Sequence, residues 1–372
     1  MQKKWTSLGL MSGTSGDGVD ASIINTDGIN YYELIKDKYF EYDSGIYKDI
    51  HNLKEKIHKI EHLKQFKDEI NDLERNITFF HADIIKQLNI SENTIIGFHG
   101  QTIYHNPEEK ISRQLGNGKL LNQLINKDIV FNFRKNDILN EGQGAPLTPV
   151  FHHLICIIKK IKLPVCFLNI GGISNITIVK DKENYSELIS KDIGPGNCLI
   201  DTWVRKNSKK KFDQDGILAS TGKNNEIIFE QAQELYLNRN SKKKLSFDTN
   251  DFDISFVRGL NLEDGVATLT DFTASIISEE LDLSLKNSKE QIKDILLCGG
   301  GRKNKILIQK ITQNLSPNLN LKFIDDYKLD GDFIESQAFA FLAIRSILKL
   351  PISFPYTTGC NTACTGGELI KN

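Results

Sequence analysis

Short apolar runs that end in glycine-rich turns constrain the fold of this chain more than any other feature. Such runs precede the turns at 99–100, 171–172 and 299–301. Buried strands that deliver backbone loops to one edge of a sheet have this pattern. Helical patterns lie between the runs, most clearly at 272–285 and 336–348. This alternation of strands and helices predicts an α/β protein.

A polar segment near the N-terminus separates two strand-like runs. Residues 5–10 are apolar, 12–18 contain only Gly, Ser, Thr and Asp, and 19–23 alternate between apolar and polar. This predicts a β-hairpin whose tip could offer several N–H and O–H donors to a phosphate, although an ordinary turn explains the pattern equally well. A strand pattern instead of a helix follows the glycines, which argues against a dinucleotide fingerprint, and the Gly-Lys-Ser/Thr of a Walker A loop is absent.

Two later segments are similar to this tip. Residues 168–177 again place glycines and small polar residues between two apolar runs, so the chain is expected to contain two duplicated halves. Residues 296–304 follow a buried strand with three glycines, which would allow flat backbone to lie against an adenine ring or a phosphate. Each segment alone is a weak signal, whereas three in one chain favour a nucleotide site.

Several polar side chains stand at positions where chemistry is possible. His99, Gln101 and Thr102 follow a strand directly and could bind a ligand, or could form an ordinary polar loop. Asp192 lies just ahead of a Gly-Pro-Gly turn, where it could act as a general base or stabilise the turn. Glu335 begins a helix, where a carboxylate complements the helix dipole whatever its function.

Composition narrows the class of protein. The 372 residues suggest two domains, and 47 basic against 48 acidic residues give a net charge of -1, which favours a small or neutral partner over nucleic acid or an anionic membrane. The six cysteines include no C-x-x-C pair, and no spacing resembles a zinc site, so reduced thiols are expected. The N-terminal apolar stretch is too short for a signal peptide or a membrane span, which predicts a cytoplasmic protein.

Taken together, these segments closely resemble the anhydro-N-acetylmuramic acid kinase family. The matching motifs, in family order, are 11–20, 98–102, 142–147, 169–175, 192–197, 298–301 and 335–340. The resemblance implies two duplicated ribonuclease-H-like domains with a nucleotide cleft between them, as in the actin-like ATPase superfamily. Domain I would comprise residues 1–140 plus the C-terminal helix at about 335–372, with the first phosphate loop and part of the sugar site. Domain II would comprise 141–334, with the general base and the nucleoside side.

The resemblance also implies a reaction. ATP, with Mg²⁺, and water would convert 1,6-anhydro-N-acetylmuramic acid to N-acetylmuramic acid 6-phosphate and ADP during peptidoglycan recycling. Asp192 matches the family's general base, and Asp17 is the candidate for holding Mg²⁺ through water, although a turn-forming role explains Asp17 equally well. The cofactor-binding positions would be Gly13, Thr14, Ser15, Gly16, Asp17, Gly18, Val19, Asp20, Gly171, Gly172, Gly299, Gly300 and Gly301. The sugar would meet His99, Gln101, Thr102 and Glu335, with the 142–148 loop nearby, and family members commonly look like homodimers.

Two departures from the family pattern and three rival functions stay open. Gly16 stands where the family usually carries a larger residue, which is expected to loosen the loop, and 243–252 keeps only part of the family's Pro-Lys-Ser-rich stretch. Neither departure is expected to touch Asp192. The rivals are a kinase for another anhydro sugar such as levoglucosan, a non-catalytic ATP-dependent sugar sensor, and a phosphatase of the same superfamily.

Overall fold

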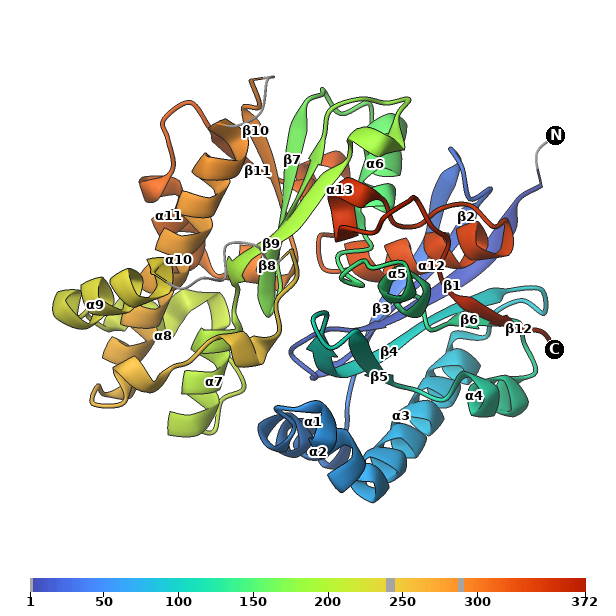
Figure 1. The fold of residues 1–372 in the computed structure, drawn as a ribbon, viewed down its shortest axis with the longest axis horizontal. Coiled ribbons are helices and arrows are strands. Elements are labelled where there is room, and N and C mark those ends of the chain that lie inside the picture. Colours follow the sequence, from blue (N-terminus) through green and yellow to red (C-terminus); the bar gives the residue numbers. More distant parts are fainter. Residues whose placement is uncertain (1–2, 239–244, 287–290) are drawn as a thin grey trace. The chain divides into compact units, whose positions relative to one another are not determined.

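The computed structural model describes all residues except 1–2, 239–244 and 287–290, and it divides into two compact units (Figure 1). The first unit consists of Met1–Lys162, Val179–Ser190 and Asp332–Asn372, and the second of Leu163–Ile178 and Lys191–Gly331. No helix in the part of the chain described combines the length and the apolar character that a membrane span needs.

The unit boundary lies further along the chain than the sequence pattern predicts. Residues 141–162, expected to open the second domain, belong to the first unit together with 179–190. Helix α6 (Pro149–Ile158) explains this difference, because the Phe151 ring lies 5.3 Å from Tyr32 and 5.9 Å from Phe341. The helix is apolar on nearly every side, so its sequence does not reveal which neighbours it packs against.

The first unit is built on a mixed sheet. Its strands are β1 (Trp5–Ser12), β2 (Gly18–Thr26), β3 (Tyr32–Glu41), β4 (Ile95–Asn106), β5 (Ile111–Leu115), β6 (Ile129–Phe131) and β12 (Glu368–Ile370). Their order is β12-β6-β4-β1-β2-β3, with β5 paired to β4. Strands β1, β2 and β3 are antiparallel, and β1, β4 and β6 are parallel. The predicted N-terminal hairpin is therefore confirmed.

The second sheet repeats this plan. Its strands are β7 (Val165–Ile170), β8 (Ile173–Val179), β9 (Ile189–Pro195), β10 (Asp294–Cys298) and β11 (Asn320–Phe323), in the order β11-β10-β7-β8-β9. In each sheet the first strand is central, the next two strands lie on one side of it, and the later parallel strands lie on the other. The predicted α/β class and the duplicated ribonuclease-H-like fold are confirmed by this shared topology.

Helices cover both faces of the first sheet. They are α1 (Ser44–Lys56), α2 (Ile60–Gln65), α3 (Lys67–Leu88), α4 (Gly118–Ile125), α5 (Lys135–Leu139), α6, α12 (Ile334–Ile347) and α13 (Pro355–Thr358). Leu8 and Leu10 point into the core that α1 and α3 close. Gly9, between them, faces α12 so closely that a Cβ atom would lie 1.9 Å from the Ser336 carbonyl oxygen. Strand alternation thus puts α12 on the opposite face from α1 and α3.

The second unit has its own helical core. Its helices are α7 (Cys198–Asn207), α8 (Ile217–Thr221), α9 (Glu226–Leu237), α10 (Leu262–Lys286) and α11 (Lys305–Asn314). Short 3₁₀ turns occur in the two units at Tyr185–Glu187, Gln214–Gly216, Thr249–Asp251, Ser255–Val257, Gly300–Lys303 and Ile324–Tyr327. Trp203 of α7 packs against Gly265 of α10, where a Cβ atom would lie 2.3 Å from the indole nitrogen. The helical patterns at 272–285 and 336–348 are confirmed as α10 and α12.

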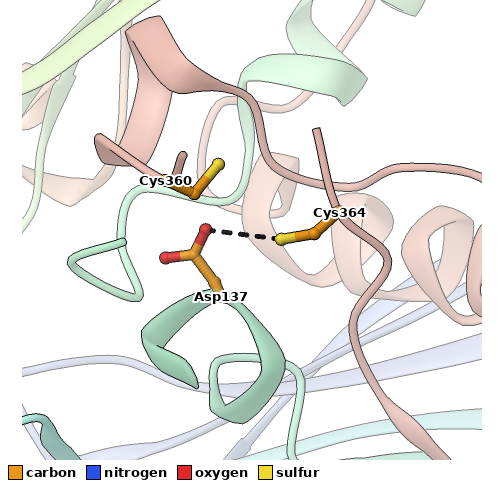
Figure 2. Close-up of side chains that lie close together, drawn as sticks. All are labelled: Asp137, Cys360 and Cys364. Atoms are coloured by element: carbon orange, nitrogen blue, oxygen red, sulfur yellow. Dashed lines mark hydrogen bonds between the residues drawn. The ribbon is translucent and has the colours of Figure 1, made fainter. Parts of the chain in front are cut away.

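All six cysteines are buried free thiols, as expected for a chain without a disulfide framework. Two of them, Cys360 and Cys364, lie beside Asp137 of α5 (Figure 2).

A buried histidine should make stability depend on pH. His81 of α3 stacks 4.8 Å from Phe98 and donates from Nδ1 to the Ile77 carbonyl oxygen at 2.8 Å, and burial lowers its pKa to about 4. Between pH 6.5 and about 4 the unfolded chain binds a proton at His81 that the folded chain does not. We therefore expect this residue to lower the free energy of unfolding by about 1.4 kcal/mol for each pH unit lost in that window.

Urea unfolding at several pH values measures this slope. The His81→Leu variant should lose its share of the pH dependence, whereas the exposed His58→Gln variant should keep the parent slope. Equal slopes for all three proteins would contradict the prediction.

Candidate active site

The tip of the β1–β2 hairpin is held in place by donors from other elements. The Gly13 carbonyl oxygen accepts hydrogen bonds from Gly16 N at 3.2 Å and from Gln101 Nε2 at 3.0 Å. Lys54 Nζ of α1 donates to the Thr14 carbonyl oxygen at 2.6 Å. Because these carbonyls are bound within the protein, the conformation of the tip is fixed without a ligand.

Gly16 is tightly packed. Its φ is +64°, and a Cβ atom would lie 2.8 Å from Ile50 Cγ2 of α1. Gly18, where the tip enters β2, would place a Cβ atom 2.4 Å from the Phe40 carbonyl oxygen. The expectation that Gly16 loosens the loop is therefore wrong, because α1 occupies the space that a larger side chain would need.

Oxygen ligands gather beside this tip. Asp17 Oδ1 accepts a hydrogen bond from Ser15 Oγ at 2.6 Å. Burial, together with the carboxylates of Asp17, Glu41 and Asp20, raises the pKa of the Tyr39 hydroxyl. A half-buried carboxylate with further carboxylates near it is a donor set that suits Mg²⁺ bound through water. The residues present therefore fit the metal that the sequence resemblance implies.

His99 occupies an irregularity in β4. Leu10 pairs with Phe98 and Met11 with Gly100, so His99 is an extra residue, as in a β-bulge. Gly100 has a φ of +76°, and a Cβ atom there would lie 2.3 Å from the Leu115 carbonyl oxygen. The glycine permits the irregularity that sets the direction of the imidazole.

Both ring nitrogens of His99 are occupied by the protein. Nδ1 donates to the Gly100 carbonyl oxygen at 2.7 Å, and Nε2 accepts from Arg134 Nε at 3.2 Å and Nη2 at 3.0 Å. The ring also stacks 4.5 Å from Phe339 of α12. Burial and the Arg134 charge hold the pKa of His99 well below its usual range, so the imidazole is neutral. These contacts indicate that His99 positions Arg134, a residue that the sequence analysis missed.

Glu335 belongs to the same group. It lies in the first turn of α12, where burial raises the pKa of its carboxyl group and the Arg134 charge lowers it. Arg134 thus interacts with both His99 and Glu335, and the three form one polar cluster of the first unit.

The other two predicted sugar ligands have different neighbours. Gln101 contacts the hairpin tip, and Thr102 Oγ1 accepts from Gln114 Nε2 of β5 at 3.1 Å. The structure therefore separates Gln101 and Thr102 from the Arg134 cluster in their hydrogen bonding.

In the second unit, the β7–β8 tip is bound to the turn that follows β9. The Gly172 carbonyl oxygen accepts from Gly196 N at 2.9 Å and Cys198 N at 3.1 Å, and the Gly171 carbonyl oxygen accepts from Asn197 N at 2.8 Å. A Cβ atom on Gly196 would lie 2.3 Å from the Gly171 oxygen. The Gly-Pro-Gly turn and the second hairpin tip therefore form one rigid element at the N-terminus of α7.

The third glycine segment packs on the end of β7. Gly299 has a φ of +80°, and a Cβ atom there would lie 2.3 Å from Asn169 Oδ1. On Gly301 it would lie 2.3 Å from Ile170 Cγ2, whereas around Gly300 it would meet nothing within 4 Å. Two of these glycines are thus needed for packing, and the middle one leaves an open backbone surface.

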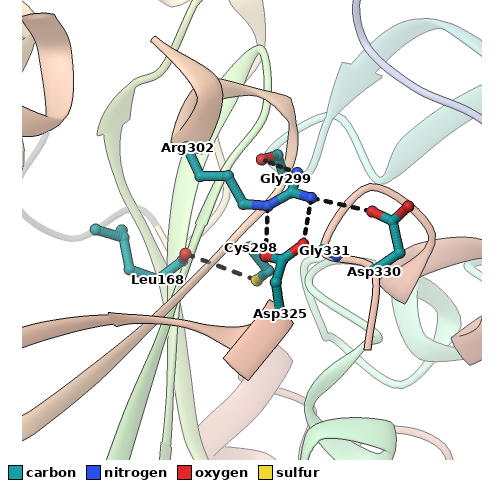
Figure 3. A network of polar contacts seen from close by, with 7 residues as sticks. All are labelled: Leu168, Cys298, Gly299, Arg302, Asp325, Asp330 and Gly331. Atoms are coloured by element: carbon teal, nitrogen blue, oxygen red, sulfur yellow. Dashed lines mark hydrogen bonds and ion pairs between the residues drawn. The ribbon is translucent and has the colours of Figure 1, made fainter. Parts of the chain in front are cut away.

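An arginine fork fixes this glycine loop (Figure 3). Buried Arg302 donates from Nε and Nη2 to the two carboxylate oxygens of Asp325, each at 2.9 Å, and from Nη2 to Asp330 Oδ1 at 3.0 Å. Its Nη1 donates to the Gly299 carbonyl oxygen at 3.1 Å, while Gly299 N donates to the Gly331 carbonyl oxygen at 2.9 Å. Hydrogen bonding to Arg302 lowers the pKa of Asp325. The sequence analysis missed both aspartates.

Truncating this fork should loosen the loop. We expect Arg302→Ala to lower the free energy of unfolding by about 1–2 kcal/mol and to raise the KM for ATP, because Gly299 loses a backbone partner. Arg302→Lys should recover little, since an ammonium group cannot form the paired contact with Asp325. Thermal unfolding and ATP-dependent kinetics measure the two effects, with Lys303→Ala as the matched control. Parent-like values for Arg302→Ala would contradict the prediction.

Asp192 lies on β9, where only 8% of its surface is exposed. Its backbone N donates to the Leu245 carbonyl oxygen at 2.8 Å, and Phe247 N donates to Asp192 Oδ2 at 2.7 Å. The contacts come from 245–252, part of the stretch expected to leave Asp192 untouched, and that expectation is wrong. Residues 243 and 244 of the same stretch lie outside the described residues.

The duplicated sheets and their glycine-rich tips define a protein of the sugar-kinase and actin-like ATPase fold class. The chain belongs to the anhydro-N-acetylmuramic acid kinase family, whose sequence pattern matches residues 5–372. The predicted family and enzyme class, a phosphotransferase that uses ATP, are confirmed.

Relatives in three bacteria agree with this assignment, and each is named anhydro-N-acetylmuramic acid kinase. The protein of Pelagibacter ubique is 54% identical over 375 aligned residues, which cover 100% of both chains. Those of Rhodospirillum rubrum and Agrobacterium fabrum are 35% and 32% identical, covering 97% and 98% of this chain and 92% and 98% of the relatives.

Solved structures with more distant similarity include two dehydratase activators. The activator of the 2-hydroxyisocaproyl-CoA dehydratase from Clostridium difficile, with bound ADPNP, is 9% identical with a TM-score of 0.40, over 91% of this chain and 94% of that one. Component A of the (R)-2-hydroxyglutaryl-CoA dehydratase of Acidaminococcus fermentans is 11% identical with a TM-score of 0.42, over 93% and 100%.

Proposed function

We propose that this chain uses ATP and water to open 1,6-anhydro-N-acetylmuramic acid and to phosphorylate its O6, giving N-acetylmuramic acid 6-phosphate and ADP in peptidoglycan recycling. The observation that carries the proposal is the buried Asp192 carboxylate, one oxygen of which is fixed by Phe247 N. An oriented carboxylate of this kind can accept a proton from water. Family membership supports the identity of the sugar.

The bond changes balance around Asp192. The anhydro bridge joins C1 to O6, so O6 becomes available for phosphorylation only when the C1–O6 bond breaks. Water attacks C1 and gives its proton to Asp192, while the electron pair of the broken bond stays on O6, which bonds to the γ-phosphorus of ATP as ADP leaves. Bound Mg²⁺ would neutralise phosphate charge, and Asp17 is the residue proposed to hold it through water.

The remaining roles follow from the two polar groups of the first unit and the glycine loops of the second. We assign sugar binding to the cluster of Arg134 and Glu335, which His99 positions, and we keep Gln101 and Thr102 as proposed sugar ligands. Phosphate contacts are assigned to Gly13, Thr14, Ser15, Gly16, Asp17, Gly18, Val19, Asp20, Gly171 and Gly172, and nucleoside contacts to Gly299, Gly300 and Gly301. Gly300 supports the last assignment, since its surroundings are open.

Product analysis in ¹⁸O-labelled water tests the reaction. We expect mass spectrometry to find the label at C1 and the phosphate at O6. Label in released inorganic phosphate would instead indicate simple ATP hydrolysis. Levoglucosan serves as the comparison substrate, and turnover of levoglucosan alone would overturn the muramyl assignment.

Two further assays address the other rivals. Binding of ATP and sugar without ADP formation would indicate a sensor, and release of phosphate from phosphosugars without ATP would indicate a phosphatase. We also propose that the chain acts in the cytoplasm, where its ATP is available, and that it forms a homodimer. Light scattering of the purified chain measures the latter, and a monomer mass would contradict it.

A further inference from the structure

A compact group of metal-ligating side chains lies in the first unit, apart from the residues assigned to the reaction. Asp137, Cys360 and Cys364 each place one ligand atom within 4.8 Å of the others, and all three residues are buried (Figure 2). Asp137 comes from α5, Cys360 follows α13, and Cys364 pairs with Ser353 in an isolated β-bridge. The chain thus brings two thiols and a carboxylate together from distant positions.

The Asp137 carboxylate is held in a fixed direction. Thr358 Oγ1 donates to Oδ1 at 2.6 Å, and Gly144 N donates to Oδ2 at 2.6 Å. A Cβ atom on Gly142 would lie 2.2 Å from Oδ2, so the loop closes tightly over the carboxylate. Hydrogen bonds that orient a ligating carboxylate in this way are a regular feature of protein metal sites.

The charge of Asp137 favours a cation. The side chain is fully buried, and among the described residues no lysine, arginine or histidine forms an ion pair with it. Burial of an ionised carboxylate is costly unless a positive charge or a metal compensates it. Two thiols beside the carboxylate select a cation that binds sulfur as well as oxygen, and Zn²⁺ has this preference.

The spacing is close to that of a zinc centre. Cys364 Sγ lies 3.9 Å from Asp137 Oδ1. A tetrahedral zinc ion, with bonds of about 2.3 Å to sulfur and 2.1 Å to oxygen, separates two such ligands by about 3.6 Å, and two sulfur ligands by about 3.8 Å. Ser353 Oγ, 3.1 Å from Cys364 Sγ, lies near enough to offer a fourth oxygen, directly or through water.

We propose that Asp137, Cys360 and Cys364 form a structural zinc site. Binding replaces the two thiol protons, which pass to solvent, with two Zn–S bonds, and the carboxylate supplies the third ligand. The C-x-x-x-C spacing and the distant aspartate match no common zinc motif, so the expectation of no zinc site, drawn from spacing alone, could not detect this cluster.

The site would tie the C-terminal segment to the loop that carries Gly144. Gly144 N binds Asp137, and its carbonyl oxygen accepts from Arg134 Nη1 at 2.8 Å, while Arg134 binds His99. Zinc at Asp137 would therefore stabilise the backbone on which the Arg134 cluster depends. The proposal does not rest on the proposed reaction.

Metal binding by the full chain tests the site without an activity assay. The reduced, chelator-treated protein is titrated with Zn²⁺ and with Co²⁺. We expect one ion per chain, a thiolate-to-cobalt charge-transfer band, and a higher Tm with Zn²⁺. Cys360→Ala and Cys364→Ala should weaken binding by about 100-fold or more and abolish the band, whereas Cys156→Ala, a buried cysteine of α6, should behave like the parent.

Two outcomes would overturn the proposal. One is a parent chain that binds no Co²⁺ through thiolate under reducing conditions, a result that does not depend on whether any variant folds. The other is parent-like binding by both Cys360→Ala and Cys364→Ala. A Cys360–Cys364 disulfide that forms readily in a parent with no affinity for metal would indicate a redox pair instead.

Discussion

Replacing Asp192 by asparagine is expected to lower kcat by about 10²- to 10⁴-fold while both ligands still bind, because the amide cannot accept the proton of water. Asparagine has nearly the same shape, and its carbonyl oxygen can still accept from Phe247 N, which now binds Asp192 Oδ2 at 2.7 Å. The local structure should therefore persist. Steady-state kinetics, together with calorimetric binding of ATP and the anhydro sugar, separate loss of the base from loss of binding.

A second carboxylate of the same unit provides the control. Asp294 begins β10 and pairs with Lys322 Nζ at 2.7 Å, at the opposite end of that strand from the glycine loop. Asp294→Asn should keep kcat within about twofold of the parent, because a partly exposed pair contributes little. An Asp192→Asn enzyme that binds both ligands and turns over at nearly the parent rate would exclude Asp192 as the base.

Local patterns predicted the sheet framework well. The tip ahead of Gly18 and the Gly171–Gly172 tip each lie between two adjacent strands, so alternation and glycine content alone locate both hairpins. Their similarity also predicted the duplication that the strand orders confirm. Such features depend on neighbours in the sequence, and a single sequence records these directly.

Contacts between distant residues were out of reach. Arg134 lies 35 residues from His99, Phe247 lies 55 residues from Asp192, and Asp137 lies 227 residues from Cys364. Nothing in the local pattern around Arg134 or Phe247 indicates which partner it will meet. The catalytic aspartate could be proposed through family resemblance, whereas the groups that hold it required the folded chain.

Substitution of Gly299 by alanine is expected to lower the free energy of unfolding by about 2–4 kcal/mol and to raise the KM for ATP. Gly299 has a φ of +80°, which disfavours any L side chain, and its new Cβ atom would lie 2.3 Å from Asn169 Oδ1 and 2.7 Å from the Ile170 carbonyl oxygen. The backbone oxygen cannot move without disturbing the end of β7. The glycine loop, and with it the contact to Arg302 Nη1, should shift.

Gly300 supplies a matched control one residue away. A Cβ atom there would meet nothing within 4 Å, so Gly300→Ala should keep the parent stability to within about 0.5 kcal/mol. Its KM for ATP is expected to rise only through the added methyl group, because Gly300 is assigned to the nucleoside. Urea unfolding and ATP kinetics of both variants therefore separate packing from binding. Equal loss of stability in the two variants would contradict the packing argument, and an unchanged KM for Gly300→Ala would remove Gly300 from the nucleotide site.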